Sequence, residues 1–187
     1  NELTFIAESS DPNVAILVQD DILTLSSSDD WNGIASITVT VRDDDFAYSN
    51  TVNFILTVTP VNDAPIITQI SDQQIEEDSQ LELTLEALDI DSNNLQFTAS
   101  SDVEDISILV SGSMLTLDPS DDYNGIANIM VTVSDGELTD TDDFELTVIP
   151  VNDAPIISLP ENITFEEDSS IVSDFSIYIQ DIDNDQL

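Results

Sequence analysis

The sequence predicts an all-β fold in which sandwiches of about 92 residues follow one another along the chain. Three observations predict it. Apolar runs rich in Val, Ile, Leu and Thr favour strands. Several runs alternate between apolar and polar residues, as Leu81, Leu83 and Leu85 do, which is the period of a half-buried strand. Similar segments also return at a fixed spacing, which indicates repeated domains.

The repeat is visible as pairs of matching motifs. Asp-Asp-Trp-Asn-Gly-Ile-Ala at residues 29–35 corresponds to Asp-Asp-Tyr-Asn-Gly-Ile-Ala at residues 121–127, which lies 92 residues later. Asp-Ile-Asp at 89–91 returns with the same spacing at 181–183. A unit of this size is large enough to have its own core, although a small one. We therefore expect separate domains rather than the short turns of a solenoid.

The segment Pro-Val-Asn-Asp-Ala-Pro occurs twice, at residues 60–65 and 150–155. Proline has no N–H and a fixed φ, and it pushes the preceding residue towards an extended conformation. Each segment is therefore predicted to be a stiff linker between domains. With the linkers as boundaries, residues 1–61 form the C-terminal part of one repeat, residues 62–151 a complete repeat and residues 152–187 the N-terminal part of a third.

The complete repeat contains seven predicted strands. They cover residues 66–70, 80–87, 95–99, 106–110, 114–117, 126–133 and 144–149, and are referred to in this order as strands A to G. Seven short strands with turn signals predict an immunoglobulin-like sandwich. In this topology the B–C and F–G loops lie at the end where the chain enters the domain. The A–B and E–F loops lie at the end where it leaves.

Charge and composition exclude several classes of function. The chain has 40 acidic residues and a single basic residue, Arg42, which gives a formal charge of −39. Nucleic acid and anionic membrane surfaces require Lys and Arg, so neither is an expected partner. The sequence has no cysteine and hence neither disulfides nor thiolate sites. Its apolar runs are too short for membrane insertion.

The acidic residues gather at the loop ends nearest to the linkers. The first predicted junction collects Asp29, Asp30, Asn62, Asp63, Asp89, Asp91 and Asp135. The second collects Glu76, Glu77, Asp121, Asp122, Asn152, Asp153, Asp181 and Asp183. Two carboxylates ~4 Å apart repel each other by ~4 kcal/mol at an effective dielectric constant near ~20. Such clusters must spread apart, take up protons or bind cations.

Calcium is the cation that these residue types favour. Ca²⁺ takes carboxylate and carbonyl oxygens as ligands, whereas softer metals prefer the His and Cys side chains that this chain lacks. The alternative is that the acids are solvated turn residues, since Asp is common in turns. Their return at equivalent repeat positions beside each linker favours calcium. Two further acidic runs, residues 43–45 and 140–143, lie around the F–G turn. Asp43 aligns with Asp135, and we interpret the rest as solvated surface.

Trp31 and Tyr123 occupy the same repeat position, directly before Asn-Gly. Each is either a platform for stacking a sugar or a side chain that packs at the corner of the sandwich. Paired carboxylates can hydrolyse glycosides, but these pairs lie at repeated linker ends rather than in one cleft. The chain also lacks His, Cys and Lys, so we predict that it is not an enzyme.

The ordered motifs Glu-Glu-Asp-Ser, Asp-x-Asp, Asp-Tyr-Asn-Gly, Val-Ser-Asp-Gly and Val-Asn-Asp-Ala-Pro resemble the bacterial cadherin-like (tandem-95 type) repeats of giant surface adhesins. The resemblance covers the whole chain and implies cadherin-like sandwiches with calcium at each junction. It implies that Glu76 or Glu77 corresponds to the glutamate near the start of a cadherin repeat. It also implies that Asp89 and Asp91 form the Asp-x-Asp pair. Asn62 and Asp63 would then be the calcium ligands of the linker. The linker is shorter than in animal cadherins, and Asp121-Asp122 replaces their Asp-Arg-Glu element. One or two ions per junction are therefore expected.

Together these features predict a calcium-rigidified structural spacer of a long extracellular adhesin or surface filament at the cell surface. Its expected partners are neighbouring repeats of the same chain, and self-assembly into a filament is left open. The alternative prediction is a carbohydrate- or protein-binding module of a secreted protein.

Overall fold

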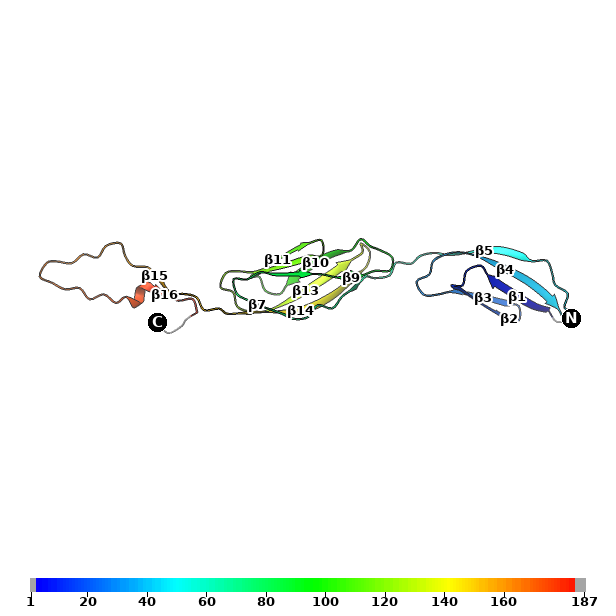
Figure 1. Cartoon of the computed structure of the whole chain (residues 1–187), viewed down its shortest axis with the longest axis horizontal. Helices are drawn as coiled ribbons and strands as arrows, with labels where there is room; N and C mark the ends of the chain where they lie inside the picture. Colours follow the sequence, from blue (N-terminus) through cyan, green and yellow to red (C-terminus); the bar gives the residue numbers. More distant parts are fainter. Residues whose placement is uncertain (1–2, 184–187) are drawn as a thin grey trace. The chain divides into compact units, whose positions relative to one another are not determined.

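The computed structural model describes residues 3–183 and divides into two compact units, one ending at Asp63 and one beginning at Ala64. Within the described residues, the regular structure is almost entirely strand, and the sole helical element is the 3-10 turn η1, Ser176–Tyr178. The predicted all-β fold is therefore confirmed (Figure 1). No helix in this part of the chain is long and apolar enough to cross a membrane.

The first unit has five strands in two sheets. They are β1 Leu3–Ser9, β2 Val14–Gln19, β3 Ile22–Ser27, β4 Gly33–Asp43 and β5 Val52–Val58. The order β1-β4-β5 forms one antiparallel sheet, and β2 and β3 form a hairpin. Val14, Ala35 and Ile37 are the buried centre of its core.

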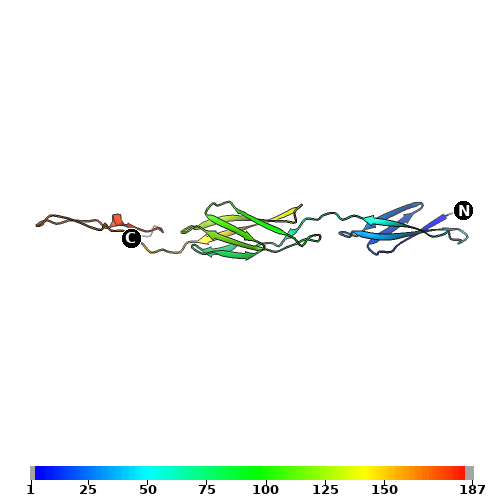
Figure 2. The same ribbon diagram turned by 90° about the horizontal axis from the view of Figure 1, so that it is seen from above.

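The second unit contains the complete sandwich. Its strands are β6 Ile66–Ile67, β7 Gln73–Glu76, β8 Leu81–Thr84, β9 Ala87–Leu88, β10 Gln96–Ser101, β11 Ile106–Ser111, β12 Met114–Pro119, β13 Gly125–Ser134 and β14 Thr139–Ile149. The two larger sheets have the orders β10-β13-β14-β7 and β11-β12-β8, and β6 pairs with β9 in a short third sheet. Figure 2 shows this unit in green to yellow. Alternate residues of β12, β13 and β14 are fully buried between the sheets, among them Leu115, Ile129 and Phe144.

Three predicted strands differ from the observed ones. Strand A is reduced to β6, and the chain then crosses to the other sheet, where the unpredicted β7 pairs in parallel with β14. Strand B is split into β8 and β9. Strand G begins at Thr139 rather than Phe144. The acidic residues 140–143 at the start of this strand have the composition of a turn. Composition alone does not show that backbone N–H groups of the neighbouring segment need these carboxylates as hydrogen-bond acceptors.

Carboxylates stabilise the crossover between β6 and β7. The N–H of Ile67 donates to Asp140 Oδ2 at 2.9 Å, and the N–H of Ile70 donates to Asp142 Oδ2 at 2.6 Å. Backbone N–H groups that leave a ladder and are shielded from water need another acceptor. The interpretation of residues 140–143 as solvated surface is therefore wrong for Asp140 and Asp142, which are half-buried and support the crossover.

The chain beyond β14 forms little regular structure. It contains β15 Ile156–Ile157, η1 and β16 Ile179–Gln180, and β15 pairs with β16. Most of its described side chains are exposed. The predicted repeat boundaries at 61/62 and 151/152 stay predictions.

The crossover contacts give a test of stability. We expect Asp142→Ala to lower the free energy of unfolding of the second unit by about 1–2 kcal/mol, because the N–H of Ile70 loses a charged acceptor. The control is Asp143→Ala, on the exposed face of the same strand, with an expected change below ~0.5 kcal/mol. Thermal unfolding of both variants and hydrogen exchange at Ile70 measure this. Equal effects of the two substitutions would contradict the role of Asp142.

Candidate metal centre

Five carboxylates meet at the end of the sandwich where the chain leaves it. Glu77, Asp153 and Asp183 each offer an oxygen, and these oxygens lie within 4.8 Å of one another. The same holds for Asp78, Asp122 and Asp153. Because Asp153 belongs to both groups, the five side chains form one cluster, which we call the exit cluster. It combines the turn after β7, the turn between β12 and β13, the linker and the residues after β16.

The two turns of the exit cluster are held by unusual backbone conformations. Asp78 and Asp122 have positive φ values of 57° and 59°, a region that Asp tolerates better than most residues because its side chain bonds locally. The N–H of Asp122 donates to Asp78 Oδ1 at 3.1 Å and ties the turns together. Asp30 and Asp168, at the equivalent positions of the other repeats, have φ values of 58° and 59°.

Glu77 is the buried member of the cluster, with 3% of its surface exposed. Its Oε1 accepts the N–H of Val151 at 2.5 Å, and its Oε2 accepts Nδ2 of Asn124 at 3.1 Å. The chain has no Lys or His, and its single Arg42 belongs to the other unit. Hydrogen-bond donors rather than a basic side chain therefore stabilise this buried charge.

The linker is also oriented by hydrogen bonds. The N–H of Asp153 donates to Asp183 Oδ2 at 2.6 Å, and the N–H of Asp183 donates to Asp181 Oδ1 at 3.2 Å. The side-chain amide of Asn152 donates to the carbonyl of Asp153 at 2.8 Å. Asp181 and Asn152 thus shape the turn and the linker, while Asp153 and Asp183 present oxygens to the cluster.

The cluster is electrostatically frustrated without a cation. Partial removal from water, reinforced mainly by the carboxylates of Asp78 and Asp121, raises the pKa of Asp122 above its usual value. Desolvation, reinforced mainly by Asp122 and Asp183, raises the pKa of Asp153 in the same way. Both shifts mean that the ionised cluster is disfavoured and that a bound proton or cation stabilises it.

The structure brings together four of the eight residues predicted for this junction, namely Glu77, Asp122, Asp153 and Asp183. The other four, Glu76, Asp121, Asn152 and Asp181, lie outside both groups. Asp78 is not among the ligands predicted from the sequence. The motif Glu-Glu-Asp nevertheless returns in the third repeat, where Asp168 is the residue equivalent to Asp78. The signal that identifies Asp78 is its place at the bend of the turn, where the positive φ directs its carboxylate towards Asp122.

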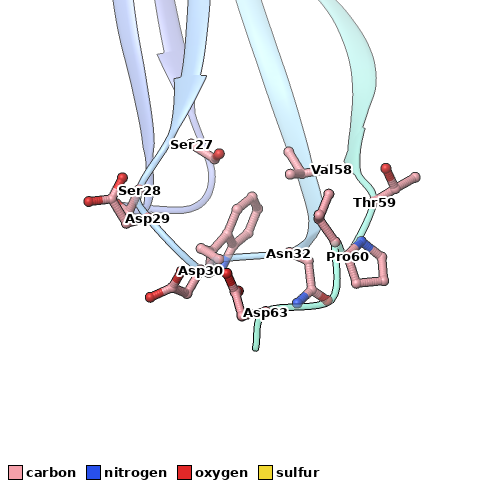
Figure 3. A pocket seen from close by; sticks show the side chains of 11 residues that line it. Ser27, Ser28, Asp29, Asp30, Asn32, Val58, Thr59, Pro60 and Asp63 are labelled. Atoms are coloured by element: carbon pink, nitrogen blue, oxygen red, sulfur yellow. The ribbon is translucent and has the colours of Figure 1, made fainter. Parts of the chain in front are cut away.

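The residues predicted for the first junction are divided between the two units. Asp29, Asp30 and Asp63 line a pocket of about 290 Å³ in the first unit, at the end of its strands (Figure 3). The side chain of Asn62 donates to the carbonyl of Asp63 at 3.1 Å, as Asn152 does in the other linker. That Asp29, Asp30, Asn62 and Asp63 form one cluster with residues of the second unit stays a prediction.

The residues of this junction in the second unit are Asp89, Asp91 and Asp135. Asp89 Oδ1 accepts the N–H of Asp91 at 2.7 Å, and Asp135 Oδ1 accepts the N–H of Leu138 at the same distance. Asp89 Oδ2 is buried and finds no hydrogen-bond donor among the described residues. A buried oxygen without a donor needs an explanation, and a bound cation is one.

Two residues that line the pocket of the first unit match, in the repeat, the two donors to Glu77. Asn32 and Val61 both line the pocket, and in the repeat they are equivalent to Asn124 and Val151, which donate to Glu77.

The aromatic residues before Asn-Gly lie over the glycine that follows. A Cβ added to Gly125 would lie 3.0 Å from the hydroxyl oxygen of Tyr123, and one added to Gly33 would lie 3.1 Å from the ring of Trp31. Both aromatic side chains are partly buried against the cores of their units. These contacts favour packing at the corner of the sandwich over sugar stacking.

The comparisons with known proteins support this fold. The family model described as Bacterial Ig domain matches residues 62–147. Together with the strand arrangement, this match shows an immunoglobulin-like fold for these residues, and it confirms the predicted class of immunoglobulin-like or cadherin-like sandwiches. No curated protein matches the chain.

Solved structures resemble the chain at low identity. Protocadherin gammaB7 EC3-6 is 19% identical with a TM-score of 0.49, and the match covers 88% of this chain and 46% of the protocadherin chain. Endo-fucoidan hydrolase MfFcnA4 from glycoside hydrolase family 107 is 20% identical with a TM-score of 0.39, covering 81% and 24%. The titin domains z1z2 are 16% identical with a TM-score of 0.39, covering 80% and 82%. The chain therefore spans about a quarter of the hydrolase.

The raised pKa of Asp122 predicts how stability depends on pH. A carboxyl whose pKa is higher in the folded state favours folding at low pH, and this contribution is lost as the pH rises through that pKa. In chelator at pH 7 we therefore expect Asp122→Asn to melt at a higher temperature than the wild type. The difference should shrink as the pH falls towards the usual range of carboxyl groups.

The control for this experiment is Asp118→Asn, which removes one charge from an exposed position of β12. Thermal melting of the wild type and both variants across this pH range provides the measurement. An Asp122→Asn protein that melts below the wild type at pH 7 in chelator would show that the repulsion inferred for the cluster is absent.

Proposed function

We propose that the chain is a calcium-rigidified spacer, a segment of a long extracellular adhesin or surface filament. The observation that carries the proposal is the exit cluster, in which the complete repeat, the linker and the following segment all contribute carboxylates. A cation that binds these groups together would stiffen the connection between consecutive repeats. Neighbouring repeats of the same chain are thus the proposed partners.

The ligands suit calcium better than other common cations. They are all oxygens, and Ca²⁺ accepts six to eight of them in flexible geometries. Mg²⁺ prefers few carboxylates and a regular octahedron. Two groups of three carboxylates that share Asp153 would hold two ions, one with Glu77 and Asp183 and one with Asp78 and Asp122. Water and nearby carbonyl oxygens would complete both coordination shells.

The proposed setting rests on the repeat organisation. The motifs resemble bacterial tandem-95 adhesin repeats, and the complete repeat matches the Bacterial Ig domain model. Millimolar calcium, as found outside cells, fills sites with dissociation constants of ~10⁻⁴–10⁻³ M. The acids lie at a joint between repeats rather than in one cleft, which supports a mechanical rather than a catalytic role.

Removal of calcium tests the proposal directly. In chelator we expect a lower melting temperature and a changed maximum dimension in small-angle X-ray scattering, because the exit cluster then repels itself. Calcium at millimolar concentration should restore both, and magnesium at the same concentration should do so less. If neither quantity responds to calcium, the spacer mechanism is wrong.

The shared position of Asp153 predicts a hierarchy of ion-binding variants. Asp153→Asn should weaken the binding of both ions, whereas Asp78→Asn and Asp183→Asn should each weaken the binding of one ion. Loss of a charged ligand corresponds to about a tenfold to hundredfold weaker affinity. Calorimetric titration with calcium measures number and affinity, with Asp118→Asn as the control. If each of the three variants weakened the binding of one ion to the same extent, Asp153 would not be a ligand shared by both ions.

A further inference from the structure

We infer that Glu77 is a positioning residue that fixes the linker where it leaves the sandwich, through hydrogen bonds that require no cation. This role goes beyond the proposed function, which assigns stiffness to calcium. It rests on that function only in treating the linker as the joint between repeats. The side chain of Glu77 connects the turn after β7, the turn before β13 and the first residues of the linker.

The reason lies in the end of the β7–β14 ladder. The last paired residues are Glu76 and Ile149, and the N–H of Glu77 still donates to the carbonyl of Ile149 at 2.9 Å. The next residue of the linker, Pro150, has no N–H to donate. Asp78 then turns away with φ of 57°, so the β7 backbone offers Val151 no further acceptor in the ladder. Oε1 of Glu77 takes its place at 2.5 Å.

Burial makes this contact effective. Glu77 is 3% exposed, and an unpaired carboxylate at such a position would be strongly destabilised. Val151 and Asn124 each supply one donor, to opposite oxygens of the carboxylate. Hydrogen bonds to a charged acceptor are roughly twice as strong as neutral ones. The start of the linker is therefore tied to the sandwich through a buried, charged acceptor.

The remaining freedom of the linker lies beyond Val151. Two residues later, the N–H of Asp153 donates to Asp183 of the following segment at 2.6 Å. Alternate N–H groups of the linker thus donate to two carboxylates, one from the sandwich that precedes the linker, Glu77, and one from the segment that follows it, Asp183. Chelation leaves the Glu77 contact in place, since both of its bonds are made to protein donors. Beyond it, the carboxylates of Asp153 and Asp183 lie close together and repel each other without a cation, so we expect apo-state motion to centre on the Asp153 side.

Amide hydrogen exchange of the whole chain in chelator tests this role. The amide of Val151 should exchange more slowly than its intrinsic rate without calcium. In Glu77→Ala it should exchange about tenfold to hundredfold faster, because it loses a charged acceptor. Glu77→Gln keeps an oxygen acceptor and should lie between the two. The amide of Val131, in the core strand β13, should change little in Glu77→Gln, which separates positioning from general destabilisation.

The results distinguish this inference from the calcium proposal. The positioning role is overturned, even if calcium binds, if the Val151 amide is unprotected in chelator. It is also overturned if amide exchange in Glu77→Gln becomes faster at Val131 by as much as at Val151. Should Glu77→Ala fail to fold, the comparison of Glu77→Gln with the wild type decides alone. A protected Val151 amide in a chain that binds no calcium overturns the calcium proposal and leaves the positioning role intact.

Discussion

The constraint on which this structure depends is a large negative charge with almost no basic side chains to balance it. The chain has 40 acidic residues and one Arg. A carboxylate that leaves water must therefore be stabilised by N–H donors, a proton or a cation. Glu77 meets this requirement with Val151 and Asn124, and Asp142 meets it with the N–H of Ile70. The carboxylates that give the chain its charge also act inside the fold as hydrogen-bond acceptors.

The same use of carboxylates appears at two places where the chain leaves a regular ladder. At the crossover from β6 to β7, the carboxylates of Asp140 and Asp142 accept backbone N–H groups that no neighbouring strand can pair. At the exit from β14, Glu77 does the same for Val151. Local carboxylates allow an acidic sequence to change direction without leaving donors unpaired. The linker is in this sense a continuation of the sandwich.

In the exit cluster, hydrogen bonding and charge act in opposite directions. The bonds to Asp78, Asp183 and Glu77 draw the turns and the linker together. The like charges of the cluster push them apart and, after desolvation, are the further cause that raises the pKa of Asp122 and of Asp153. A site that is assembled by its backbone contacts but opposed by its charge is poised to take up a cation. This balance is the physical basis of the spacer that we propose.

The sequence by itself determined the fold class and the repeat spacing, and it placed acidic residues beside each linker. Alternating apolar residues and the position of the linkers were sufficient for these, because both are local patterns. Only the tertiary structure decided that β7 pairs with β14, that Asp140 and Asp142 support a crossover, and that Asp78 replaces Glu76 in the cluster. Neighbouring acids such as Glu76, Glu77 and Asp78 look alike in sequence. Which of them is buried, exposed or turned inward depends on where the strand ends and on the positive φ that follows.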